Sequence, residues 1–214
     1  MNTKEKILAV SLELFSEKGF SAVSVRDIAA AVGVRESAMY KHFASKQAVF
    51  DRLVTDYLAR SDEFMGGIHA LPTDDPAVLS QVAAIYKNLS DEDFLRMGGS
   101  VFTDFLMQPD VLQFWRMISI ERFHDKDLAK LWNHHLFETP IAFQTKLFGA
   151  LIEAGALKLV DPSILALEFY TPLLLLYLQA LPFETDGPEF KLAVELASQH
   201  MKHFREIYAV KEEN

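Results

Sequence analysis

Helical periodicity punctuated by glycine and proline is the feature that most restricts how this chain can fold. Apolar residues recur at intervals of three and four through most of the chain, whereas few stretches alternate apolar and polar residues as strands do. Glycine and proline fall mainly between the periodic segments, where they end helices and form turns. The pattern therefore predicts an all-α protein.

The first two predicted helices have clear boundaries. The first runs from about residue 3 to 18, and Gly19 is expected to end it in the left-handed conformation. The second begins at Ser24, because Ser24 and Asp27 have the spacing of a capping box. It is expected to stop at Gly33.

A short third helix is predicted over residues 36–42, and Ser45 is the expected N-cap of a long fourth helix. The fourth helix should end near Met65, before the pair Gly66–Gly67. Further helices are predicted at 76–89, 91–107, 109–122, 126–154, 162–181 and 188–208. Pro140 should kink or split the helix that contains it.

The segment 164–183 is apolar and long enough to span a bilayer. An ionised Glu168 in mid-span would cost about 2.5–3.5 kcal/mol on an insertion scale. The segment also lacks flanking Lys and Arg residues. We therefore interpret it as a buried core or interface helix, and expect no membrane partner.

Charge is distributed unevenly along the chain. The net charge is −9, but residues 1–50 carry a balance of +2 and the remainder carries −11. Such asymmetry indicates an end of the chain that binds nucleic acid. Cysteine is absent, which excludes disulfide scaffolds and thiolate catalysis and is consistent with a cytoplasmic location.

The stretch from Val23 to Lys46, VSVRDIAAAVGVRESAMYKHFASK, has the features of a helix-turn-helix. Ala29 is small enough for two helices to cross closely, and Gly33 permits the tight turn that follows. The second helix is left with a polar outward face that fits the major groove of DNA. A three-helix bundle with a polar surface helix would show part of the same pattern.

Further positions extend this pattern on both sides of the turn: Phe15, Gly19, Ser24, Ile28, Ala29, Gly33, Val34, Tyr40, His42, Phe43 and Lys46. With them, residues 3–50 resemble the N-terminal domain of the TetR family of transcriptional regulators. Residues 51–214 resemble the family only as an all-helical body of the expected size. The resemblance implies a three-helix DNA-binding domain over 1–47, joined by the fourth helix to a helical effector-binding and dimerisation domain within 48–214.

The resemblance assigns contacts with the DNA backbone to residues of the helix-turn-helix and the start of the fourth helix: Ser24, Arg26, Tyr40, Lys41, His42 and Lys46. A role as a helix cap would explain Ser24 equally well, and half-buried packing would explain Tyr40. Lys46 stands where its ammonium and the helix N-terminus can both bind phosphate.

Base contacts are expected from Arg35, Glu36 and Ser37 at the start of the third helix. Arg35 can bind guanine through two hydrogen bonds, and Glu36 can accept one from a cytosine amino group. Glu36 would alternatively pair with Arg35. The family often has Gly or Pro near 36–37 and Thr at 38, so this chain's operator sequence cannot be carried over.

Residues 51–214 hold 20 aromatic residues, which most simply form the core. Their number also indicates an apolar ligand pocket, the default form of a small-molecule site. The predicted pocket residues are Phe102, Phe105, Trp115, Glu121, His124, Trp132, Phe143 and Glu168. The predicted dimer interface comprises Leu147, Leu151, Leu167, Tyr170, Leu174 and Tyr177, from the apolar 162–181 helix and the second half of 126–154.

No metal, cofactor or catalytic site is predicted. Glu121 and His124 have the spacing of half a di-iron site, but no second Glu-x-x-His element is present. We expect a homodimeric repressor that leaves its DNA operator when a small apolar or aromatic effector binds. The alternatives are a helical protein-binding module, and a small enzyme that uses Glu121 and His124 as acid and base.

Overall fold

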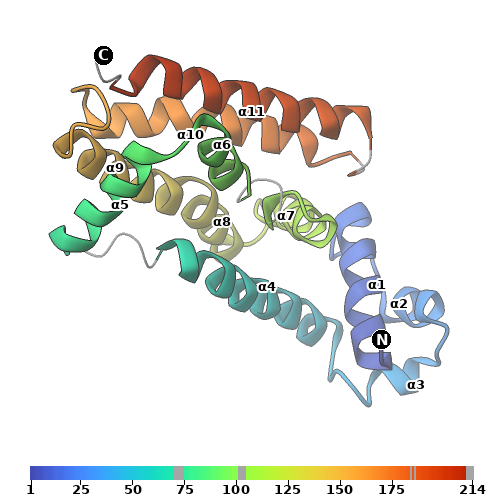
Figure 1. Ribbon diagram of the computed structural model, residues 1–214. Coiled ribbons are helices and arrows are strands. Elements are labelled where there is room, and N and C mark those ends of the chain that lie inside the picture. The colour runs from blue at the N-terminus through green and yellow to red at the C-terminus, as the bar shows by residue number, and fades with distance from the viewer. Residues whose placement is uncertain (70–74, 101–104, 184, 186, 211–214) are drawn as a thin grey trace. The chain divides into compact units, whose positions relative to one another are not determined.

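Helices account for all the regular structure in the part of the computed structural model that is described, residues 1–69, 75–100, 105–183, 185 and 187–210 (Figure 1). An isolated antiparallel bridge joins Leu157 and Ala209. The all-α prediction is confirmed. The chain forms two compact units: Met1–Glu63 with Pro109–Trp132, and Phe64–Gln108 with Asn133–Asn214.

The first unit combines the N-terminal helices with two helices from the middle of the chain. Its elements are α1 (Thr3–Lys18), α2 (Val25–Val32), α3 (Glu36–Met39), most of α4 (Lys46–His69), α7 (Pro109–Glu121) and most of α8 (Lys126–Asn133). Because α7 packs against α1, the compact unit extends beyond the predicted domain boundary at residues 47–48. The predicted division at residues 47–48, between a DNA-binding domain and an effector-binding domain, stays a prediction.

Helix α1 starts at a capping box formed by Asn2 and Glu5 and has the predicted bounds. Gly19 has a φ of 81° and a ψ of 155°, so it does not take the left-handed helical conformation that was expected. This extended, positive-φ region is essentially restricted to glycine. The chain therefore leaves α1 in a direction that other residues disfavour.

Helix α4 is longer than predicted. Ser45 caps it as expected, since its hydroxyl accepts from the Ala48 amide at 3.0 Å. The helix then continues through Gly66–Gly67 to His69. Glycine costs only about 1 kcal/mol relative to alanine inside a helix, so the pair does not end it.

The second unit is built from the remaining helices. They are α5 (Pro76–Asn88), α6 (Asp91–Ser100), the π-helical segment η2 (His134–Glu138), α9 (Thr139–Glu153), α10 (Pro162–Ala180) and α11 (Pro188–Tyr208). The predicted helix 91–107 falls partly outside the described residues. Helix α10 packs against α9 and α11 and buries Leu165, Phe169 and Leu173 among others.

Pro140 has the predicted effect on its helix. The π-helical segment η2 separates α8 from α9 just before this proline. Proline has no amide hydrogen to donate to the carbonyl of Leu136, four residues earlier. The hydroxyl of Tyr170 on α10 donates to that carbonyl instead, at 2.9 Å. The interruption is thus stabilised by a contact from the neighbouring helix.

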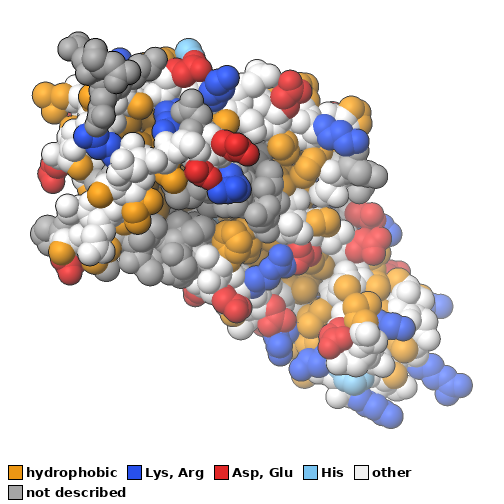
Figure 2. Space-filling model, viewed as in Figure 1, with side chains coloured by type: hydrophobic (Ala, Val, Ile, Leu, Met, Phe, Trp, Pro, Cys, Tyr) orange, Lys and Arg blue, Asp and Glu red, His pale blue; other side chains and the backbone are white. Residues whose placement is uncertain are grey.

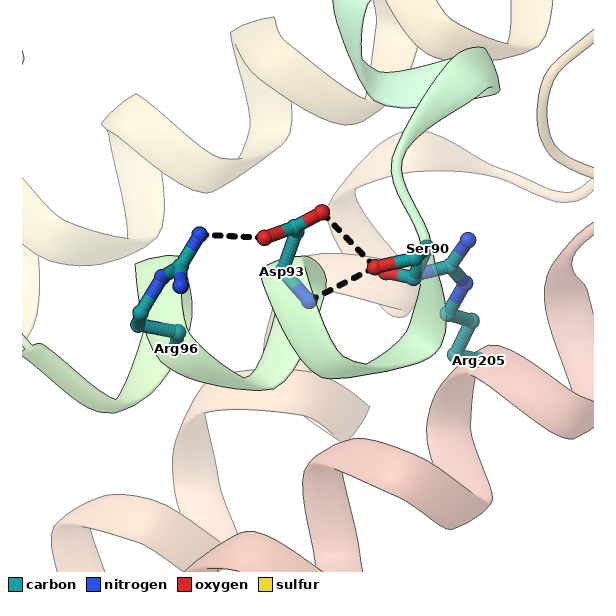
Figure 3. Close-up of polar contacts among 4 residues, drawn as sticks. All are labelled: Ser90, Asp93, Arg96 and Arg205. Atoms are coloured by element: carbon teal, nitrogen blue, oxygen red, sulfur yellow. Dashed lines mark hydrogen bonds and ion pairs between the residues drawn. The ribbon is translucent and has the colours of Figure 1, made fainter.

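Arg205 on α11 holds the turn between α5 and α6 (Figure 3). Its guanidinium donates to the Ser90 carbonyl at 2.7 Å and to the Leu89 carbonyl, and lies 5.0 Å from the centre of the Phe94 ring. Ser90 in turn caps α6, because its hydroxyl accepts from the Asp93 amide at 3.0 Å. One cation therefore connects the last helix to the start of α6.

One helix in the described part of the chain, α10, is long and apolar enough by composition to cross a membrane. Its buried face and its contacts with α9 and α11 are those of the core helix expected from the sequence.

Candidate nucleic-acid interface

The helix-turn-helix consists of α2, the turn at Gly33 and α3. Ser24 caps α2 in the predicted capping box with Asp27, and hydrogen bonds from the Ser24 hydroxyl and amide lower the pKa of Asp27. Gly33 is left-handed, with a φ of 80° and a ψ of 31°. The next amide, that of Val34, donates to the Ala29 carbonyl at 2.9 Å. These local bonds fix the turn that the sequence predicts.

Apolar contacts fix the angle between the two helices. Ile28, Ala29 and Met39 are buried, with exposed fractions of 0%, 2% and 1%. Helix α3 ends at Met39, three residues earlier than predicted. Tight turns follow it, in which the His42 amide donates to the Met39 carbonyl at 2.9 Å. Phe43 is buried after these turns, so the chain bends inward before another helical turn can form.

The predicted DNA-binding side chains lie on the exposed side of this motif. All but one of them are exposed: Ser24, Arg26, Arg35, Glu36, Ser37, Tyr40, Lys41 and His42. Figure 2 shows Lys and Arg side chains projecting from the surface around α2 and α3. Tyr40 is 53% exposed, so its ring is available to a partner and is not packed in the core.

Lys46 differs from the other predicted DNA contacts. Its ammonium donates to the carbonyls of Phe20 and Val23, each at 2.6 Å. It also lies 4.1 Å from the centre of the Phe20 ring. Two of its three hydrogens are therefore used inside the protein, which gives Lys46 a structural role that sequence reasoning missed. Its contact with phosphate stays a prediction.

The predicted pocket residues are divided between the two compact units. Four of them, Trp115, Glu121, His124 and Trp132, belong to the first unit, whereas Phe105, Phe143 and Glu168 belong to the second. Phe102 lies outside the described residues. The pocket stays a prediction, because aromatic residues are the same signal for a core and for a ligand site.

Trp115 lies in a buried aromatic cluster with Tyr57, Phe114 and Trp132. Tyr57 stacks on Phe114 with ring centres 3.8 Å apart, and the Trp115 indole donates to the Tyr57 hydroxyl at 2.8 Å. Burial raises the pKa of Tyr57 to about 12. The indole nitrogen of Trp132 is buried and has no hydrogen-bond partner among the described residues. Trp132 is therefore a predicted pocket residue whose polar group is both buried and unused among the described residues.

The polar pocket candidates are occupied or exposed. Glu121 is buried, and its carboxylate accepts from the Phe20 amide at 2.8 Å. His124 is exposed in the turn after α7. Glu168 is also exposed and accepts a hydrogen bond from Tyr208. Of the apolar candidates in the second unit, Phe105 is buried and Phe143 is half-buried.

The predicted dimer residues divide between the core and the surface. Leu151, Leu174 and Tyr177 are buried within the chain, so they cannot supply area to a partner. Leu147 and Tyr170 are half-buried, and Leu167 is 42% exposed. The predicted set thus mixes buried and exposed residues of α9 and α10, and an interface on these helices stays a prediction.

The exposed apolar face continues onto α11, which sequence reasoning missed. A groove of about 310 Å³ lies between α10 and α11 and is lined by Leu176, Gln179, Ala180, Phe183, Glu189, Leu192, Ala193 and Leu196. Leu192 and Leu196 are 54% and 39% exposed. Their spacing of four residues places them on one helical face, a signal that was available in the sequence.

Comparison with known proteins agrees with this geometry. Residues 7–53 match the model of the bacterial regulatory proteins of the tetR family. The HTH-type transcriptional regulator YerO of Bacillus subtilis (strain 168) is 31% identical over 96 residues, which are 43% of this chain and 33% of YerO. The biofilm operon icaADBC negative regulator IcaR of Staphylococcus aureus (strain Newman) is 38% identical over 58 residues, 26% of this chain and 31% of IcaR. The matched stretch thus spans about a third of each curated relative.

The likeness in fold extends over the whole chain. The crystal structure of a TetR family transcriptional regulator from Pseudomonas syringae pv. tomato DC3000 has a TM-score of 0.57 at 20% identity, and the match covers 97% of each chain. The sequence match and the helix-turn-helix geometry both concern the N-terminal part of the chain, called the head here (residues 1–47). The likeness in fold also covers the rest of the chain, the body (residues 48–214). Residues 7–53 thus match the TetR family of bacterial regulatory proteins in sequence, and the chain shares the fold of a solved TetR-family regulator.

Proposed function

We propose that the protein is a homodimeric transcriptional repressor that binds a double-stranded DNA operator and releases it when a small apolar or aromatic effector binds. The observation that carries this proposal is the exposed polar face of the helix-turn-helix, set on a fixed apolar base of Ile28, Ala29 and Met39. Residues 1–50 also carry the positive charge balance that DNA binding needs.

The role of the head follows from the chemistry of its exposed side chains. Arg26 and Lys41 supply cations for phosphates, and Tyr40 supplies a hydroxyl. Arg35 stands at the N-cap of α3, where a helix that enters the major groove presents its first residues to base edges. The relatives that match this part of the chain are named as transcriptional regulators.

Dimerisation is supported by the apolar face of α10 and α11. Leu175 and Leu192 are more than half exposed, and Leu196 on α11 and Phe183 in the turn after α10 are also exposed. A two-fold symmetric interface requires a surface that is complementary to itself, and a pair of adjacent apolar helices can satisfy this requirement. Two heads on one dimer would then bind half-sites about 34–36 Å apart.

An effector site is supported by the aromatic cluster of the first unit. The Trp132 indole N–H is buried without an acceptor among the described residues, which normally costs about 1–3 kcal/mol. A ligand with an aromatic body and one acceptor atom would satisfy that group. The cluster joins α4, α7 and α8. A ligand bound there would therefore contact α4, the helix that follows the helix-turn-helix.

The two residues that the enzyme alternative would use as acid and base, Glu121 and His124, are not arranged as a catalytic pair. The Glu121 carboxylate is engaged by a backbone amide, and His124 is exposed in a turn. The protein-binding alternative still makes a different prediction from the regulator, because it requires no affinity for DNA.

The test is a titration of the purified protein, stripped of any ligand, against fragments of its own genome at several salt concentrations. We expect tight binding that weakens steeply with salt, as counterion release requires. Arg26→Ala/Lys41→Ala should weaken binding and lower the salt slope by about two. Tyr40→Phe should weaken binding with little change in slope, because it removes a hydroxyl and no charge.

Lys202→Ala is the matched control, since Lys202 is an exposed lysine on α11 in the second unit. It should leave both affinity and slope unchanged. If no genomic fragment binds tightly, or if Lys202→Ala weakens binding as much as Arg26→Ala/Lys41→Ala, the regulator proposal is wrong and the protein-binding module takes its place.

Effector binding can be followed by intrinsic fluorescence, because the two tryptophans of the chain both lie in the aromatic cluster. A small aromatic compound that releases DNA should change this fluorescence at the same concentration. Release of DNA with no change in fluorescence would place the effector site elsewhere.

A further inference from the structure

The turn between α1 and α2 is held by side chains that come from two other helices. The Glu121 carboxylate, at the end of α7, accepts from the Phe20 amide at 2.8 Å. From the other direction, the ammonium of Lys46 in the first turn of α4 donates to the Phe20 and Val23 carbonyls. In the α1–α2 turn, the negative Glu121 thus binds a backbone amide, and the positive Lys46 binds two backbone carbonyls.

The Glu121 contact is buried and specific. Only 8% of the Glu121 surface is exposed, so its carboxylate is largely shielded from water. A hydrogen bond to a charged group in such a place is stronger than one between neutral groups. The Phe20 ring packs edge-on against Phe15 and Phe50, which restricts the amide that Glu121 binds.

Gly19 makes room for this contact. A Cβ atom at position 19 would lie 3.1 Å from Oε1 of Glu121 and 3.2 Å from Cγ2 of Ile120. The backbone at Gly19, with a φ of 81° and a ψ of 155°, directs the following amide, that of Phe20, to the carboxylate. The missing side chain and the backbone conformation of Gly19 thus both allow the Glu121 carboxylate to reach the Phe20 amide.

We infer that Glu121 is a positioning residue for DNA binding: together with Lys46 it clamps the α1–α2 turn and so fixes the helix-turn-helix. This inference rests on the proposed function. The turn leads directly into Ser24, the cap of α2, so a shift of the turn changes the position of the helix that supports α3. Glu121 acts on DNA affinity through the backbone and does not touch DNA.

Two measurements on Glu121→Ala and Glu121→Gln test the clamp. The first is hydrogen exchange of the Phe20 amide in the free protein, followed by NMR. Alanine removes the acceptor, so exchange should be at least about tenfold faster, the ratio that corresponds to 1.4 kcal/mol. Glutamine keeps an acceptor oxygen and should preserve most of the protection.

The second measurement is the salt dependence of DNA binding. A displaced head makes fewer phosphate contacts, so Glu121→Ala should bind about tenfold more weakly and with a lower salt slope. Glu121→Gln should restore both values. A mere loss of folded protein would lower the active fraction and leave the slope unchanged. Glu153→Ala, at an exposed carboxylate at the end of α9, is the control and should behave as the wild type.

Gly19→Ala gives an independent perturbation of the same contact. Its Cβ should displace the carboxylate and accelerate exchange of the Phe20 amide, and its effect on affinity should be smaller when combined with Glu121→Ala than alone. Equal exchange in the wild type and Glu121→Ala would overturn the clamp. Faster exchange with unchanged DNA affinity would overturn the positioning role. A wild-type protein that binds no DNA overturns the proposed function and the positioning role together, while the exchange result still decides whether the clamp exists.

Discussion

Lys46 offers a direct test of whether a residue expected to bind phosphate has a structural role. Replacing it by methionine keeps an unbranched apolar side chain over the Phe20 ring but removes the ammonium. The carbonyls of Phe20 and Val23 then lose the donor that lies 2.6 Å from each of them. The change therefore isolates the two hydrogen bonds from most of the packing.

The expected loss of stability follows from these contacts. A hydrogen bond to a charged group contributes about 1.5–3 kcal/mol net, so two contribute about 3–6 kcal/mol. Freeing the side chain returns up to about 2 kcal/mol of rotational entropy. With the full entropy returned, we therefore expect Lys46→Met to lower the free energy of unfolding of the first unit by about 1–4 kcal/mol. Lys41→Met, at an exposed lysine between α3 and α4, should change it by less than about 0.5 kcal/mol.

Urea denaturation followed by tryptophan fluorescence measures this quantity, because both tryptophans belong to the first unit. The denaturant midpoint should fall for Lys46→Met and stay constant for Lys41→Met, with unchanged slopes. If Lys46→Met unfolds like the wild type but binds DNA with a salt slope lower by about one, the ammonium acts on phosphate and the structural reasoning is refuted.

Three further predictions concern other parts of the chain. Gly33→Ala should cost about 1–2 kcal/mol in urea denaturation, because the residue is left-handed and an added Cβ would meet no atom within 4 Å; an unchanged midpoint would contradict that conformation. Burial raises the pKa of Tyr57 and of Tyr86 to about 12, whereas tyrosines in the unfolded chain ionise near 10. Their contribution to stability is therefore complete below about pH 10 and is lost as the pH rises towards 12, so Tyr57→Phe/Tyr86→Phe should flatten the alkaline decline of the denaturation midpoint. Leu192→Glu should convert the dimer to a monomer in light scattering, whereas Leu159→Glu, at a 92% exposed leucine outside the α10–α11 groove, should not; a dimeric Leu192→Glu protein would exclude this face.

The boundaries of the helices were largely predictable because local chemistry sets them. Ser24 and Asp27 form their capping box across three residues, and Gly33 adopts its left-handed turn without help from distant parts of the chain. Asp161 likewise caps α10 through the amides of Ser163 and Ile164. The exposed polar face of the helix-turn-helix followed from the same short-range pattern.

The contacts of the site were not predictable because they join distant segments. Glu121 and Phe20 are 101 residues apart in the chain, and no periodicity connects them. Glu121 and Trp115 were predicted to line a pocket, and their burial alone does not separate a ligand site from a core, since both use the same residue types. In α10 the apolar residues surround the helix, so its pattern could not separate the buried Tyr177 from the exposed Leu175.

The π-helical segment before Pro140 has a consequence for insertions and deletions in this part of the chain. An α-helix turns by about 100° per residue, so deleting one residue within α9 would rotate the buried Phe148 and Leu151 away from the core. A π-helical turn already holds one residue more than an α-helical turn. Removing one residue from His134–Glu138 would convert that turn to α-helical geometry and keep both flanking helices in register. This segment is therefore the place where the length of the body can change while the core keeps its packing.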